Sequence, residues 1–194
     1  MIKNLHIARL KTQVEQFQRE ARGSVTVEMV ITLPLLFWML WATYEFFEIH
    51  RYQSARDKAT YTVADMLSRE QDVVTPTYID NVKVLFDQIA NDDGVNQIRV
   101  SVIEFDEAND EYDAVWSEVR GPGQLAPFAE GAISDGHSKL PKMRNAEQVI
   151  LVESLTVYQP RLDLVFDDTI PMESRVFTSL RFSPQLCFDK CKDL

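Results

Sequence analysis

A continuous run of apolar positions near the N-terminus is the most pronounced pattern in the chain. From residue 24 to 44 the sequence reads SVTVEMVITLPLLFWMLWATY, and residues 29–44 carry no charge. At 1.5 Å per residue the run forms a helix of about 31 Å, which matches the hydrocarbon thickness of a bilayer. Trp38 and Trp41 lie near its C-terminal end, where aromatic side chains favour the membrane interface. The pattern predicts a transmembrane helix over 24–44, kinked at Pro34, rather than the buried helix of a soluble core.

Beyond this run a helical period continues with more polar residues between the apolar ones. Small or apolar side chains recur at intervals of three to five residues, at Phe47, Tyr52, Ala55, Ala59, Val63 and Met66. Such spacing places one stripe on one side of a helix. We therefore expect residues 45–70 to extend the N-terminal helix, with the stripe packed against a core.

The remaining residues, 71–194, alternate between helical and strand patterns. We expect a helix over 78–90, because Thr75-Pro76-Thr77 is a start signal and apolar residues follow at helical spacing. Alternation of apolar and polar residues predicts strands at 98–102, 112–119, 149–158 and 175–182, with a long glycine-containing surface loop over 120–147. One helix followed by four strands indicates an α+β head domain, with a mainly antiparallel sheet packed on the long helix.

Charge is distributed unevenly along the chain. The formal net charge is -10. Residues 1–23 hold five basic side chains and two acidic ones, a net of +3, so residues 24–194 carry -13. A basic flank before an apolar helix stays in the cytoplasm, which places the residues after about 50 on the far side of the membrane. The acidic main body would repel phosphates, so we expect no nucleic acid partner.

A short motif stands at the junction of the basic stretch and the apolar run. Arg22-Gly23-Ser24-Val25-Thr26-Val27-Glu28 places a carboxylate inside the apolar segment. Such a group costs about 3 kcal/mol near a bilayer centre and less near its edge. One explanation is that Glu28 lies close enough to the cytoplasmic face to reach lipid headgroups. The other explanation gives Glu28 a partner in a neighbouring subunit.

The second explanation follows from a resemblance to type IV prepilins, in which a glycine after basic residues is followed five positions later by a glutamate and an apolar helix. The closer resemblance is to the TadE/TadF family of minor pilin-like proteins (pseudopilins) of the tight-adherence (Tad, type IVc) pilus system. It rests on the motif just quoted, on Leu33-Pro34-Leu35-Leu36, on Tyr44-Glu45-Phe46-Phe47-Glu48 and, in outline, on Tyr158-Gln159-Pro160. Met29 replaces the tyrosine typical of the major pilins of this system, which favours a minor component.

The resemblance implies a processing site and a set of partners. A prepilin peptidase would cut between Gly23 and Ser24, removing residues 1–23 as a cytoplasmic leader peptide. Glu28 would meet the new N-terminal amine of an adjacent subunit and set the register of assembly. The implied partners are that peptidase, other minor and major pilins, and the assembly platform of the bacterial inner membrane, with the head in the periplasm and the subunit assisting pilus assembly, initiation or adherence.

No enzymatic site is expected in the head. The motifs of α/β-hydrolases, zincins and P-loop proteins are all missing from the sequence. His137 is the single histidine of the head, and its neighbours Asp135 and Ser138 are too close in sequence to point together toward it. The acidic cluster around residues 104–113 lacks the spacing of an EF-hand and is interpreted as a solvated hairpin. We expect no catalytic residues, no metal and no cofactor.

Two further expectations complete the sequence-based interpretation. Cys187 and Cys191 are the only cysteines, and their spacing on an oxidising side of a membrane predicts a disulfide that pins the C-terminal tail. The alternative to a pilin-like subunit is an uncleaved single-pass scaffold or binding protein of the cell envelope. That alternative shares the same anchor and the same head, but gives Glu28 no special task.

Overall fold

The computed structural model describes residues 24–90, 95–129, 131–160 and 169–190. The chain divides into two compact units, Met1–Phe47 and Glu48–Leu194, here named the apolar unit and the globular unit. Helix α2, Ser24–Ser68, contributes to both units. The prediction that the N-terminal apolar helix continues beyond residue 44 is confirmed as far as Ser68. The predicted leader peptide, residues 1–23, lies outside the described residues.

The globular unit contains the second helix, α3, at Pro76–Ala90. The start of this helix lies two residues before the predicted one because Thr75 acts as its N-cap. The Thr75 Oγ1 accepts a hydrogen bond from the Tyr78 N–H at 3.2 Å. Pro76 occupies the first helical position, where its missing N–H costs nothing.

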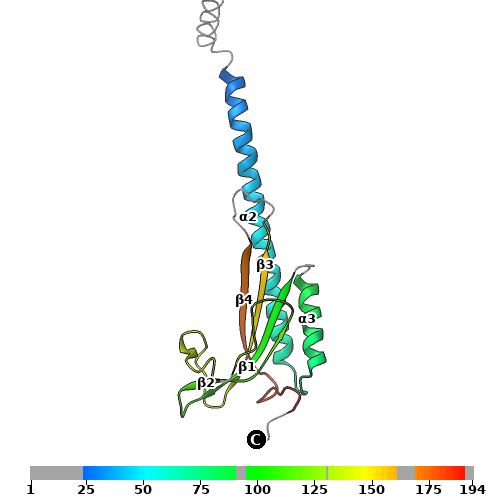
Figure 1. Cartoon of the computed structure of the whole chain (residues 1–194), viewed down its shortest axis with the longest axis vertical. Helices are drawn as coiled ribbons and strands as arrows, with labels where there is room; N and C mark the ends of the chain where they lie inside the picture. The colour runs from blue at the N-terminus through cyan, green and yellow to red at the C-terminus, as the bar shows by residue number, and fades with distance from the viewer. Residues whose placement is uncertain (1–23, 91–94, 130, 161–168, 191–194) are drawn as a thin grey trace, which may run out of the picture. The chain divides into compact units, whose positions relative to one another are not determined.

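The sheet has four antiparallel strands in the order β2-β1-β3-β4. Their bounds are β1 Asn96–Asp106, β2 Glu111–Arg120, β3 Gln148–Tyr158 and β4 Ile170–Ser179. The α+β class and the antiparallel sheet are therefore confirmed (Figure 1). The turn between β1 and β2 is closed by Asp106, whose Oδ1 accepts the Ala108 N–H at 2.9 Å, and by Asp110, which adopts a positive φ of 53°.

The predicted last strand, 175–182, is wrong at both ends. β4 begins at Ile170 and ends at Ser179. The chain then leaves the sheet because Arg181 binds the end of α2: its N–H donates to the Ser68 carbonyl at 3.0 Å, and its guanidinium pairs with Asp65. Capping of a distant helix thus ends the strand before Phe182.

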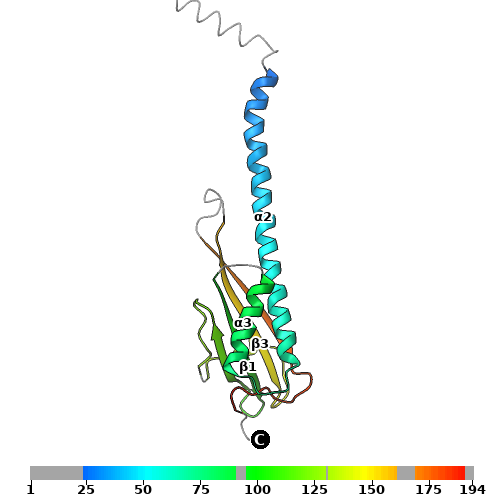
Figure 2. The ribbon, with the colours of Figure 1, turned by 90° about the vertical axis from the view of Figure 1, so that its right-hand side faces the viewer.

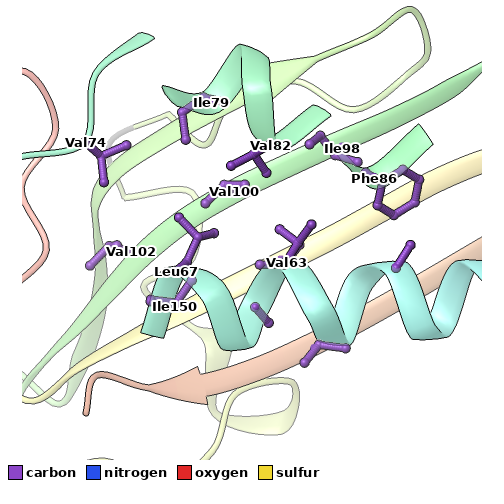
Figure 3. Close-up of a cluster of buried hydrophobic side chains, with 14 of the residues drawn as sticks. Val63, Leu67, Val74, Ile79, Val82, Phe86, Ile98, Val100, Val102 and Ile150 are labelled. Carbon is purple, nitrogen blue, oxygen red and sulfur yellow. The ribbon is translucent and has the colours of Figure 1, made fainter. Parts of the chain in front are cut away.

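The main core lies between the two helices and one face of the sheet. Figure 2 shows α3 and the C-terminal part of α2 on the same side of the sheet. Figure 3 shows the side chains that meet there: Val63 and Leu67 of α2; Ile79, Val82 and Phe86 of α3; Ile98, Val100 and Val102 of β1; and Ile150 of β3. All of them are buried, as is Ala59 of the predicted stripe.

The opposite face of the sheet is covered by the long connection between β2 and β3. This connection is irregular apart from a short 3-10 helix at Gly136–Ser138. It covers a second cluster of buried side chains, Ile103, Tyr112, Leu140 and Leu151. The predicted surface loop thus also packs on the sheet, and Ser101 on this face of β1 is fully buried.

Gln97 binds this connection to the sheet through two hydrogen bonds to the backbone of one residue, as a neighbouring strand would. Its side-chain amide donates to the Leu125 carbonyl at 2.9 Å and accepts the Leu125 N–H at 2.7 Å. A Cβ at position 123 would lie 2.1 Å from Gln97 Oε1, and a Cβ at position 121, where φ is +90°, would lie 2.2 Å from the Asn96 carbonyl oxygen. Position 121 therefore requires glycine, whereas a side chain at position 123 would displace the Gln97 amide from Leu125.

Candidate functional site: the apolar helix and the sheet face

The described part of the apolar unit is one helical segment, residues 24–47, with its apolar side chains turned outward. Its large hydrophobic side chains, sixteen between Val25 and Phe47, are 45% to 67% exposed. By length and composition the helix can cross a membrane, and none of its most apolar window is buried within the protein. Soluble monomers rarely expose so large a continuous apolar surface, so the segment requires lipid or protein around it.

The polar groups of this segment are arranged to tolerate a nonpolar surrounding. Thr32 Oγ1 donates to the Glu28 carbonyl at 2.6 Å, and Thr43 Oγ1 donates to the Met39 carbonyl at 2.8 Å. Hydroxyl groups bonded to their own helix leave no unpaired donor for lipid to accommodate. The helix continues through Pro34, whose missing N–H leaves the carbonyl four residues earlier without its usual donor.

Glu28 is the exception within this segment. It is exposed, and it is the only charged residue between positions 24 and 44. Its contacts within the described residues involve its backbone carbonyl, not its carboxylate. Ser24 opens the described helix one position after the predicted cleavage point, while Gly23 lies outside the described residues. The arrangement presents one acid on an otherwise apolar helix surface.

In the globular unit His137 lies between two acidic side chains and an aromatic ring. Its Nε2 lies 3.1 Å from Asp110 Oδ1, and its Nδ1 lies 3.9 Å from Asp135 Oδ1. The ring packs edge-on against Tyr112, with the centroids 5.2 Å apart. Asp135 thus lies at ion-pair distance from His137, although residues so close in sequence seldom point together. These contacts join the β2–β3 connection to the β1–β2 turn.

The acidic hairpin provides no metal site among the described residues, and one of the two cysteines is in a disulfide. Across the described ranges, His, Cys, Asp and Glu side chains form no group of three that is poised to hold a metal ion. Cys187 is disulfide-bonded. Cys191 is the only other cysteine in the sequence, and it lies outside the described residues.

An ionic row across the covered sheet face is the main polar feature that the sequence analysis missed. The Glu153 carboxylate on β3 receives Arg99 from β1 at 2.5 Å and Arg175 from β4 at 3.3 Å. Arg99 also donates to the Ala126 carbonyl at 2.8 Å and lies over the Phe128 ring. Each of the three strands has a charged residue among apolar ones, which could have indicated an ion pair within the sheet. The strand order that brings Arg99, Glu153 and Arg175 side by side could not be predicted from the sequence.

A second missed feature is Arg56 of α2, which is almost fully buried. Its guanidinium lies 3.0 Å from the Tyr52 ring centroid, and its Nη1 donates to the Tyr52 carbonyl at 3.0 Å. Tyr52 in turn packs edge-on against Tyr158 of β3. Arg56 therefore acts as part of the helix–sheet packing rather than as a surface charge.

The connection between α2 and α3 holds an acid, Glu70, whose pKa is shifted. Burial acts to raise the pKa of Glu70, but hydrogen bonds from Tyr78 and from the N–H groups of Asp72 and Gln71 outweigh it and lower the pKa. The two backbone bonds measure 3.3 and 3.1 Å. Burial and the adjacent Glu70 raise the pKa of Tyr78. The hydrogen bond between Tyr78 and Glu70 joins the first turn of α3 to the connection.

No family model, no curated protein and no solved structure matches the chain.

Proposed function

We propose that this protein is a minor pilin-like subunit of a type IV (Tad) pilus, cleaved after Gly23 by a prepilin peptidase and assembled through its N-terminal helix. The observation that carries the proposal is the position of Glu28 on the exposed, otherwise uncharged part of α2, five residues after Gly23. The continuity of this apolar segment with a helix that packs in an α+β unit supports the same role. The globular unit would be held at the periplasmic side of the inner membrane.

The chemistry of Glu28 explains why such a subunit would keep a costly acid in lipid. A carboxylate and an ammonium group are each unfavourable in hydrocarbon when alone, but a matched pair offsets part of both desolvation costs. Cleavage after Gly23 would create an ammonium group at Ser24. A neighbouring helix whose carboxylate meets that group is fixed in axial position, since apolar helix surfaces alone slide past each other with little penalty.

Cleavage is tested by intact mass spectrometry of the full chain produced with an active prepilin peptidase. We expect a product of 171 residues that begins at Ser24, because 194 minus 23 residues remain. Gly23→Leu should abolish processing, whereas Ala21→Leu, the same kind of enlargement two residues earlier, should leave it intact. A chain that still begins at Met1 would refute processing and favour the uncleaved envelope scaffold.

The assembly role is tested with Glu28→Gln, which retains the shape of the side chain and removes its charge. We expect the variant to be cleaved and to accumulate in the membrane, but to be lost from sheared filaments. Thr32→Val is the matched control, because the Thr32 hydroxyl bonds only to its own helix. Equal incorporation of the Glu28→Gln chain and the native chain would contradict the assembly role of the acid.

A further inference from the structure

A groove with a volume of about 290 Å³ lies at one end of the sheet in the globular unit. Leu155 and Val157 of β3 follow Glu153 at intervals of two residues, so they lie on the face of the sheet opposite to the two helices. The other apolar residues that line the groove come from the chain before β1, from the β2–β3 connection and from β4: Val95, Pro122 and Pro171.

Hydrogen bonds hold the walls of this groove in place. The Thr156 Oγ1 donates to the Val95 carbonyl at 3.3 Å, and Val157 stands opposite Pro171 in the β3–β4 register. The two hydrogen bonds between the Gln97 side chain and the Leu125 backbone fix the part of the β2–β3 connection that follows Pro122. The groove therefore belongs to the folded unit, and a partner that enters it meets a surface that is already ordered.

The groove is an uncharged surface on an acidic unit. Residues 24–194 carry -13, and Glu28 and Glu45 are the only charged residues among positions 24–47, so residues 48–194 carry -11. The eight residues that line the groove are all uncharged. Val95 and Val157 at its rim are 62% and 47% exposed. Anionic lipids repel an acidic surface, so this rim is where the unit can approach a bilayer and remove apolar side chains from water.

This end of the sheet adjoins the part of α2 that follows the apolar unit. Tyr158, next to Val157, packs on Tyr52 of α2 with the ring centroids 4.9 Å apart. Tyr52 comes five residues, or about 8 Å of helix, after Phe47, the last residue of the apolar unit. The headgroup layer on each side of the hydrocarbon is about 5–8 Å thick. A bilayer that surrounds the apolar segment up to Phe47 therefore extends, along the helix, almost to Tyr52.

We propose that the rim of this groove docks on the surface of the bilayer that holds α2, with Val95 and Val157 inserted between the phospholipid headgroups. The proposal rests on the insertion of α2 in a membrane, but not on cleavage after Gly23 or on assembly of a pilus. Because the groove is uncharged, apolar burial rather than attraction to anionic lipid holds the contact, so it should not weaken at high salt. The docked unit would keep one tilt relative to the membrane.

The test uses the full chain in vesicles of phosphatidylethanolamine and phosphatidylglycerol, with Trp38→Phe, Trp41→Phe and the probe Val157→Trp. We expect the introduced indole to lose emission when lipids brominated on their acyl chains replace the ordinary lipids, at low and high salt alike. The same chain without Val157→Trp gives the background from Trp116.

Val73→Trp in place of Val157→Trp is the matched control. Val73 is also a half-exposed valine, 43% exposed, but it lies in the connection after Ser68, at the other end of the α2 segment that begins near Tyr52. Emission from an indole at this position should be the same in ordinary and brominated lipid. Val95→Asp, added to the Val157→Trp chain, places a charge at an exposed position of the rim, so the fold should persist while the loss of emission becomes smaller.

Equal emission of the Val157→Trp chain in the two kinds of lipid would overturn the proposal. The native chain shows whether α2 itself is inserted, because brominated lipid should quench Trp38 and Trp41. If these two tryptophans are quenched and the probe is not, only the docking of the groove is wrong; if none is quenched, the insertion of α2 is wrong as well. A shift in probe emission that grows with the protein-to-lipid ratio, without quenching by brominated lipid, would indicate contact with a second copy and would also overturn the proposal.

Discussion

Replacement of Glu153 by glutamine should destabilise the globular unit strongly, because one carboxylate serves two guanidinium groups. The Glu153 and Arg99 side chains are each 13% exposed, and Arg175 is 35% exposed. Removing one partner of a fully buried pair costs about 3–5 kcal/mol. Arg175 can turn partly to water, and Arg99 keeps its hydrogen bond to the Ala126 carbonyl, so we expect a loss smaller than that of a fully buried pair, about 2–3 kcal/mol.

The free energy of unfolding is measured by urea titration of the full chain in mild detergent. The chain carries Trp38→Phe and Trp41→Phe, so that the fluorescence of Trp116 alone is followed. Glu173→Gln is the matched control, since Glu173 lies on β4 but is exposed, and it should change stability by less than about 0.5 kcal/mol. Replacing Arg99, Glu153 and Arg175 together by Met, Leu and Met should recover much of the loss, because no unpaired charge then remains buried. A loss below about 0.5 kcal/mol for Glu153→Gln would refute the claim that the ion pairs of Glu153 are shielded from solvent and stabilise the fold.

Two further predictions concern the core and the helix connection. Phe86→Ala should lower the free energy of unfolding by about 3–5 kcal/mol because it opens a cavity in the main core. Val84→Ala, at a position that is 55% exposed on the same helix, should change the free energy of unfolding little. Similar losses for the two variants in the same urea assay would contradict the packing of α3. Glu70→Gln should weaken the dependence of stability on pH in the acid range. The pKa of Glu70 in the folded chain lies below the ordinary value of 4.5, so this group contributes stability above that value, and the contribution is lost as pH falls through the folded pKa. An unchanged acid limb in thermal melts between about pH 3 and 6 would show that the contacts of Glu70 do not differ between folded and unfolded chains.

The helices and most of the strands were predictable because their signals are local. The apolar run and the stripe through Ala59 and Val63 repeat at the helical period, and α2 follows them from residue 24 to 68. Thr75 and Pro76 mark the beginning of α3 in the sequence. Glu28 was identified as a candidate because a charge within an apolar run is visible without any tertiary information.

Strand ends and sheet faces were less predictable because distant segments decide them. β4 ends at Ser179 since Arg181 binds the end of α2, a contact between residues more than one hundred positions apart. Ile103 and Leu151 are buried because the β2–β3 connection returns across the sheet and packs on them. Gln97 binds that connection through its side-chain amide, and nothing in the sequence distinguishes it from a surface glutamine.

Local pattern therefore determined which segments are helix, strand and membrane-compatible, because hydrophobic period, capping and length act over a few neighbouring residues. Tertiary structure alone decided that Arg99, Glu153 and Arg175 form one row, since their alignment depends on the strand order β2-β1-β3-β4 and on the register of two strand pairs. It also decided that the C-terminal segment around Leu186 and Phe188 lies on Trp116 and Val74. Such contacts depend on the free energy of packing the whole core, which cannot be judged from any single segment of the sequence.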